Sequence, residues 1–163
     1  GDAIYLAKIE TKYWIEYICK RFENTGKHIS PELAEEICRL VDNHSSYVQQ
    51  LSWLLWIRTI NTATTEQLSY ALEDLLDQNN ILFQSETENL SAYQMNFLKA
   101  IVDGIHTKFS SKEVISKYNL GTSANIVRLK NALLQKELIE TNGKEIVLAD
   151  PVFGVWFKKE MLY

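Results

Sequence analysis

The sequence predicts a mainly α-helical protein, in which a helical bundle is followed by a winged helix-turn-helix domain with a small β-hairpin wing. Three observations support this prediction. Four segments in the first half repeat apolar residues at helical spacing. Residues 110–136 contain two short helical patterns joined by a glycine turn, the arrangement of a helix-turn-helix. Asn142-Gly143 then separates two short β-prone runs, which is the strongest local signal for a hairpin.

The charge is unevenly spread along the chain. Residues 1–88 contain 7 Lys and Arg against 14 Asp and Glu, a net charge of −7, whereas residues 89–163 contain 10 against 7, a net charge of +3. Such a split indicates two units with different partners, and the basic half suits an anionic one. We therefore predict two domains, 1–88 and 89–163, separated at the polar segment 86–89.

Several features bear on the compartment. The chain shows no signal peptide and no apolar run long enough to cross a bilayer, so we predict a cytoplasmic protein without membrane contact. Cys19 and Cys38 are too few for a disulfide framework or a metal cluster, and we expect two reduced, partly buried thiols. The chain begins at Gly1 without a methionine, which indicates a tag remnant or a piece cut from a longer protein.

The first half is predicted to form a bundle of four helices. Thr11 caps the first helix, and Ser30-Pro31 begins the second, with proline at the first helical position. Thr64 and Gln67 form a capping box for the fourth helix. The predicted helices cover about residues 12–25, 31–43, 47–60 and 65–84.

The third of these helices has an unusual composition. Its apolar residues, among them Trp53, Ile57 and Ile60, are distributed over nearly all of its faces. A helix of this kind is typically buried on every side at the centre of a bundle. We therefore expect residues 47–60 to be the central helix of the first domain.

The second half is predicted to follow the order of a winged helix. Ser91 and Gln94 form a capping box for a helix over about 92–106. The helix-turn-helix comes next, and the hairpin after it is the wing. Pro151 then begins a last apolar segment.

Within the helix-turn-helix, Ser110 is predicted to cap the first helix, with Glu113 closing a capping box. Gly121 is free to take a positive φ in the turn, and Thr122 or Ser123 caps the second helix. The second helix is expected to bury three residues at helical spacing, Ile126, Leu129 and Leu133.

The opposite face of this second helix carries the candidate contact residues Arg128, Asn131 and Gln135. Their side chains can form bidentate contacts with base edges in a major groove. Hydroxyls and backbone N–H groups near helix starts can hold phosphate, and a lysine at the wing tip can reach an adjacent groove. These supporting candidates are Ser111, Lys112, Thr122, Ser123 and Lys144. Surface helices commonly have a polar outer face and many winged helices bind protein, so a protein or intramolecular contact stays open beside nucleic acid.

No catalytic pattern is present in the sequence. Thr25-Gly26-Lys27 resembles part of a phosphate-binding loop, but the earlier glycine is missing and His28 stands where Ser or Thr is required. We interpret Gly26 as the end of a helix. His28, His44 and His106 are scattered, without metal-ligand spacing. We therefore expect no catalytic residue, metal or cofactor in this chain itself.

Six stretches of the sequence support a resemblance to a known family. They are Tyr17-Ile18 to Phe22, Thr25 to Ile29, Asn43 to Leu51, Leu90-Ser91 with Gln94, Tyr118 to Ser123, and Asp150 to Phe153 with Trp156. Their order and spacing resemble the C-terminal part of archaeal-type P-loop ATPases within the AAA+/STAND group. In that family a helical lid and then a winged helix follow the nucleotide-binding domain, and this order matches nearly all 163 residues.

The resemblance implies a parent ATPase that binds ATP and Mg²⁺ through an upstream nucleotide-binding domain, which would be the partner of this chain. The phosphate-binding loop, the acidic metal-binding strand and the sensor residue would lie upstream, so the chain alone should not hydrolyse ATP. The lid of such ATPases can contribute a residue to the nucleotide pocket, and His44 lies at the matching place. Relatives often have His-Pro-Tyr there, whereas this chain has Ser45-Ser46 before Tyr47, and no arginine stands at that helix start.

Two functions are therefore considered. The first is a C-terminal regulatory or interaction region of an AAA+-like ATPase, whose winged helix contacts double-stranded DNA or another protein domain. The alternative is a free-standing winged-helix transcription regulator that binds DNA, with residues 1–88 as a ligand-sensing or dimerising bundle.

Overall fold

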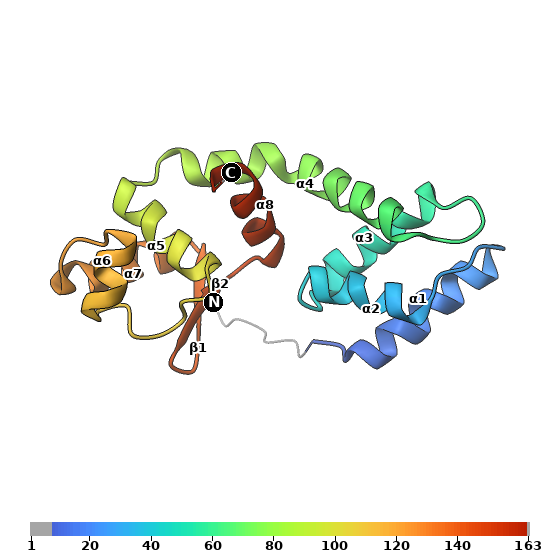
Figure 1. Cartoon of the computed structure of the whole chain (residues 1–163), viewed down its shortest axis with the longest axis horizontal. Helices are drawn as coiled ribbons and strands as arrows, with labels where there is room; N and C mark the ends of the chain where they lie inside the picture. Colours follow the sequence, from blue (N-terminus) through green and yellow to red (C-terminus); the bar gives the residue numbers. More distant parts are fainter. Residues whose placement is uncertain (1–7, 163) are drawn as a thin grey trace. The chain divides into compact units, whose positions relative to one another are not determined.

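Eight helices and one two-stranded sheet make up residues 8–162, the part of the chain that the computed structural model describes (Figure 1). The chain divides into two compact units, Gly1–Asn79 and Asn80–Tyr163. The predicted fold class, mainly helical with a winged helix and a small hairpin, is confirmed. No helix among the described residues is both long enough and apolar enough to cross a membrane.

The division between the units falls inside a helix, α4 (Thr65–Glu88). The polar segment at 86–89, where the sequence analysis placed the boundary between 1–88 and 89–163, lies at the end of that helix instead. The last turns of α4 therefore belong to the second unit by their contacts.

The first unit contains α1 (Thr11–Asn24), α2 (Pro31–Leu40), α3 (Ser45–Arg58) and the first part of α4. Helix α2 packs against both α1 and α3. The Ser30 hydroxyl accepts the Leu33 N–H at 3.1 Å, and Thr64 and Gln67 exchange the two bonds of a capping box, so these predicted caps are confirmed. The buried side chains that α1 contributes to the core are Trp14, Ile18 and Phe22.

The predicted cap at Thr11 is wrong. Glu10 precedes α1 and makes no side-chain capping bond. The Thr11 hydroxyl instead accepts a hydrogen bond from the Asn43 amide at 2.9 Å, which links the start of α1 to the loop after α2. Gly26 takes a φ of +78° just after α1, as a glycine that ends a helix does.

The expectation that α3 is buried on every side is also wrong. Its residues Val48, Leu51, Leu54 and Leu55 are buried. Trp53 is 59% exposed and Ile57 is 49% exposed, and Ile60 just beyond the helix is 81% exposed. The first unit covers one side of α3 and leaves an apolar surface on the other.

Cys19 and Cys38 are free thiols, the first half-buried and the second buried. Burial raises the pKa of the Cys38 thiol to about 11, so this group stays protonated near neutral pH.

The second unit contains the last turns of α4, then α5 (Ala92–Val102), α6 (Lys112–Tyr118), α7 (Ser123–Gln135), β1 (Ile139–Asn142), β2 (Glu145–Leu148) and α8 (Pro151–Met161). The predicted capping box of Ser91 and Gln94 begins α5. The Asp150 carboxylate accepts the N–H groups of Val152 and Phe153 and so caps α8.

The hairpin is present, with its turn one residue later than predicted. Strands β1 and β2 are antiparallel, and Asn142 pairs with Glu145. The loop is therefore Gly143-Lys144, with Gly143 at a φ of +64°, and Asn142 belongs to the strand. The backbone at His106 covers the other edge of β2, because the Ile146 N–H donates to the His106 carbonyl at 2.8 Å.

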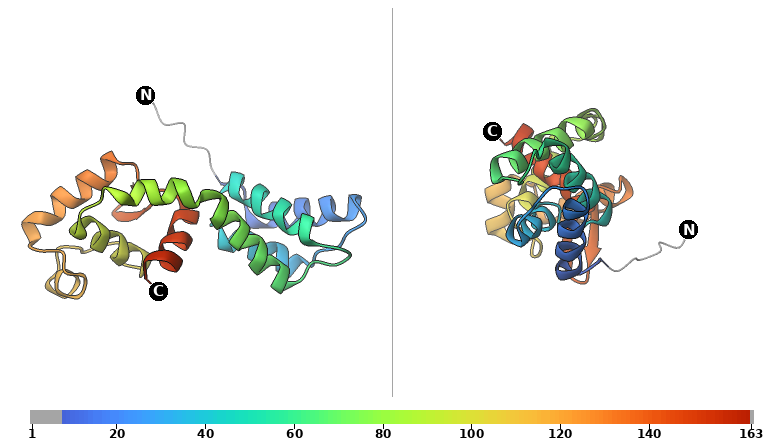
Figure 2. Two further views of the ribbon diagram at one scale, coloured as in Figure 1. Left: turned by 90° about the horizontal axis from the view of Figure 1, so that it is seen from above. Right: turned by 90° about the vertical axis from the view of Figure 1, so that its right-hand side faces the viewer.

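Helix α8 lies beside the last turns of α4 (Figures 1 and 2), and an aromatic cluster joins the two. The Phe83 ring lies 5.4 Å from the Phe153 ring and 5.6 Å from the Trp156 ring. The Trp156 indole N–H donates to the Asn80 side-chain oxygen at 2.8 Å. These contacts make the end of α4 part of the winged helix core.

Candidate nucleic-acid or protein interface

Helices α6 and α7 and the turn between them form the helix-turn-helix of the second unit. Helix α6 is capped by Ser111, whose hydroxyl accepts the Val114 N–H at 3.2 Å, so the predicted cap at Ser110 is wrong. The two serines are adjacent, and Ser111 has the extended backbone, with φ at −66° and ψ at 149°, from which its side chain reaches the third helical N–H.

The turn uses two residues with positive φ, Asn119 at +53° and Gly121 at +88°. The prediction for Gly121 is confirmed. A Cβ atom there would lie 3.2 Å from the Asn125 amide nitrogen, so the site is restricted by contact as well as by φ. Two side chains hold the turn from outside it. The Asn96 amide donates to the Asn119 carbonyl at 3.1 Å, and the Asn125 amide donates to the Leu120 carbonyl at 3.2 Å.

Helix α7 buries Ile126, Leu129 and Leu133, as predicted. Arg128, Asn131 and Gln135 are all exposed and follow one another at helical spacing, so they share the outward face. None of these three side chains makes a hydrogen bond or an ion pair with residues 8–162. This face is therefore available to a partner.

The supporting candidates lie at the starts of α6 and α7 and in the hairpin loop. Lys112 is the first residue of α6, and Ser123 is the first residue of α7. Thr122 occupies the capping position of α7 without a side-chain capping bond, and both Thr122 and Ser123 are exposed. Ser111 already accepts a backbone N–H as a cap, so its hydroxyl can only donate to a phosphate. Lys144 is exposed in the two-residue loop of the hairpin.

Sequence reasoning missed Val127, which is 63% exposed on α7. It lies outside the buried stripe, and its helical neighbours are Ala124 and Asn131. An exposed aliphatic side chain beside amide and guanidinium groups can pack on a thymine methyl group or on an apolar protein surface. The signal was present in the sequence, because an aliphatic residue one position after Ile126 must face away from the core.

His44 lies just before α3, at its capping position, and makes no side-chain capping bond. Its ring centroid is 4.7 Å from that of Tyr47. The Nδ1 atom of His44 is buried and has no hydrogen-bond partner among the described residues. An unsatisfied buried polar atom costs roughly 1–3 kcal/mol, so a group that approaches this nitrogen would relieve that cost.

Within residues 8–162, no group of three or more His, Cys, Asp or Glu side chains is arranged to hold a metal ion. Two carboxylate–arginine ion pairs lie on helix surfaces of the first unit. They join Glu36 to Arg39 and Asp74 to Arg58.

Comparison with known proteins defines the second unit. Residues 81–159 match a family described as a probable winged helix domain. The fold also resembles that of a Walker-type ATPase from Pyrococcus abyssi, with a TM-score of 0.68 and 18% sequence identity. The likeness covers 93% of this chain and 42% of that protein, so the chain spans less than half the length of the ATPase. No curated protein matches the sequence.

Proposed function

We propose that this chain is the C-terminal lid and winged helix of an ATP-driven ATPase, with the first unit as the lid. The supporting observation is the likeness to the Walker-type ATPase, which extends over 93% of this chain and therefore includes both the helical unit and the winged helix. The remainder of that protein is longer than the part matched here. In this proposal ATP and Mg²⁺ bind an upstream nucleotide-binding domain, and the chain transmits the nucleotide state.

The exposed apolar surface of α3 supports a protein neighbour for the first unit. Trp53, Ile57 and Ile60 leave large apolar groups in water although the unit has a packed core. Grouped apolar side chains on a surface are typical of sites where another protein surface docks. In this proposal the nucleotide-binding domain covers part of this surface, and His44 at the start of the same helix lies toward the nucleotide.

The winged helix is proposed to contact double-stranded DNA or another protein domain through the outward face of α7 and the wing. Arg128, Asn131 and Gln135 supply hydrogen-bond donors and acceptors that form no hydrogen bond with any other described residue. The net charge of +3 over residues 89–163 favours an anionic partner, whereas Val127 adds an apolar contact that suits protein equally well.

The proposal is tested first by reading the coding sequence upstream of Gly1. A phosphate-binding loop within a few hundred codons is expected, and its absence would refute the proposal. The longer protein should hydrolyse ATP, and replacement of its phosphate-loop lysine by alanine should abolish the activity. The 163-residue chain alone should show none. A natural start codon next to Gly1 would favour the free-standing regulator, which should then bind duplex DNA without any ATPase domain.

A further inference from the structure

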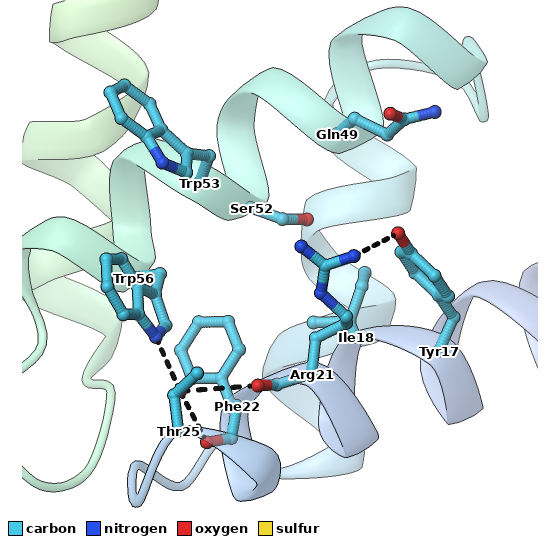
Figure 3. Close-up of a pocket in the computed structure, with 9 residues that line it drawn as sticks. All are labelled: Tyr17, Ile18, Arg21, Phe22, Thr25, Gln49, Ser52, Trp53 and Trp56. Atoms are coloured by element: carbon cyan, nitrogen blue, oxygen red, sulfur yellow. Dashed lines mark hydrogen bonds between the residues drawn. The ribbon is translucent and has the colours of Figure 1, made fainter.

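A cavity of about 410 Å³ opens between α1 and α3 in the first unit (Figure 3). Aromatic side chains from both helices line it, namely Tyr17, Phe22, Trp53 and Trp56. Its volume lies within the range of roughly 300–1,000 Å³ that small-molecule sites occupy. All the residues that line it belong to the first unit.

The polar groups of the cavity include one cation and no carboxylate. Arg21 lines it with Thr25, Gln49 and Ser52. Residues 1–88 have a net charge of −7, so a lining with one positive charge and no negative charge stands out from the rest of the unit. The cavity lining therefore carries a single positive charge, that of Arg21, within a domain that is otherwise acidic.

Among the described residues of the first unit, Arg21 is an arginine without an acidic partner. Arg39 and Arg58 each pair with a carboxylate, whereas no carboxylate of residues 8–162 lies within 4.0 Å of the Arg21 guanidinium. One of its nitrogens donates to the Tyr17 hydroxyl at 2.9 Å. Figure 3 shows the guanidinium between Tyr17 and Ser52. The other donors of the planar fork are left for a ligand.

The aromatic wall at Trp56 is held in place before any ligand arrives. The Trp56 indole N–H donates to the Thr25 hydroxyl at 2.8 Å, and that hydroxyl donates to the Phe22 carbonyl at 2.9 Å. The Lys27 ammonium lies 3.9 Å from the Trp56 ring centroid and donates to the Trp56 carbonyl at 2.7 Å. A fixed wall reduces the ordering that binding requires. Trp53, at 59% exposure, lines the same cavity and presents a second indole ring to a ligand.

We propose that this cavity binds a planar aromatic group that bears an anionic substituent. The ring packs against the indole and phenol rings, and the anion accepts hydrogen bonds from Arg21, whose fork matches the geometry of a carboxylate or a phosphate. Nucleoside monophosphates and aromatic carboxylates share this chemistry. The inference does not depend on the proposed function, because the cavity lies wholly within the first unit and the wing and α7 take no part in it.

The test is isothermal titration calorimetry of the whole 163-residue chain with four probes: AMP, indole-3-acetate, adenosine and inorganic phosphate. At least one ring anion, AMP or indole-3-acetate, should bind with a Kd below about 1 mM. The ring without the anion and the anion without the ring should each bind at least about tenfold more weakly. Binding of AMP alone identifies a nucleotide site, and binding of indole-3-acetate alone identifies a carboxylate site. The proposal is overturned if neither ring anion binds at 5 mM, or if adenosine binds as tightly as AMP without any binding of indole-3-acetate.

Substitutions locate the binding. Arg21→Gln should raise the Kd of the ring anion at least about tenfold, and Trp53→Ala at least about fivefold through lost stacking. Both residues are exposed, so circular dichroism should show an unchanged fold. The matched control is Arg39→Gln, because Arg39 is an exposed arginine of the same unit that does not line the cavity. Equal affinities of the Arg21→Gln and Arg39→Gln variants would refute the assignment.

Discussion

Phe83 is predicted to hold the end of α4 in the winged helix core. Its side chain is fully buried and contacts the rings of Phe153 and Trp156 on α8. Replacing a buried phenylalanine by alanine typically lowers the free energy of unfolding by about 3–5 kcal/mol. We expect a loss in this range for Phe83→Ala, because the ring lies among other aromatic side chains of the core.

The matched control is Ile81→Ala, two residues earlier on the same helix. Ile81 is 82% exposed, and exposed substitutions usually change the free energy of unfolding by less than about 0.5 kcal/mol. Both variants remove apolar atoms from the same helix, more of them at Phe83, and the two positions differ most in burial.

Native-state hydrogen exchange of the α8 amides in the whole chain measures this difference. A loss of about 3–5 kcal/mol corresponds to exchange that is faster by roughly two to three and a half orders of magnitude. The α8 amides of Ile81→Ala should exchange at nearly the wild-type rate. If Phe83→Ala leaves the exchange of α8 within threefold of the control, α4 does not contribute to this core and the winged helix begins after residue 88.

Three further effects are expected. Asn80→Ala should lower the free energy of unfolding by about 1–3 kcal/mol, since it leaves the buried indole N–H of Trp156 without its acceptor; chemical denaturation measures this. Arg128→Ala should weaken duplex DNA binding, expected at a Kd of about 10⁻⁴–10⁻⁶ M, and should reduce the slope of log K against log salt by about 0.9; fluorescence anisotropy measures both. The hydrogen bond from Arg58 holds the pKa of Asp74 below its ordinary value. The stability from this pair is therefore present above the ordinary carboxyl pKa and is lost as pH falls through the lower folded-state pKa.

Each of these effects has its own control. For Asn80, Asn80→Ala should cost less in a Trp156→Phe background than in the wild type, because that background has no indole donor to leave unsatisfied, and an equal cost in both backgrounds would contradict the argument. For Arg128, Lys158→Ala removes one exposed charge from α8 and should leave DNA binding nearly unchanged. Complete absence of duplex binding at low salt would make the winged helix a protein-binding module. For Asp74, the Asp74→Asn variant should lose no stability relative to wild type once the pH is below the lowered pKa of Asp74, and at pH 6 the difference should be at most about 1 kcal/mol, as for an exposed pair.

Local signals in the sequence predicted most element boundaries. Ser30, Thr64 with Gln67, and Ser91 with Gln94 cap helices as expected, because each of these hydrogen bonds joins residues no more than three positions apart. Gly121 takes the positive φ that its turn needs. Such contacts depend on the local backbone, so short windows of sequence contain the required information.

The errors have a different origin. Thr11 and Ser110 have the right side chains for caps, but the path of the backbone assigned the caps of these helices to Glu10 and Ser111. The composition of α3 indicated burial on all sides, although only one side meets other helices. Composition reports how apolar a helix is, and it does not report how many neighbours the helix has.

The candidate interface was predictable in part. The outward position of Arg128, Asn131 and Gln135 follows from the spacing of the buried stripe on α7. The same spacing also places Val127 outward, but the sequence analysis did not identify this residue. The cavity beside Arg21 was not predictable, because its walls come from helices α1 and α3, which are separated along the chain.

The sequence by itself determined the helices, the glycine turn, the hairpin and the polar face of α7, since these depend on residue spacing and on bonds between near neighbours. Only the tertiary structure decided that the last turns of α4 join the winged helix, that one side of α3 stays exposed, and that Arg21 has no acidic partner within residues 8–162. The bond between Asn80 and Trp156 spans 76 positions. Contacts of this range depend on how whole elements pack, because their free energy is gained only when distant side chains leave water together.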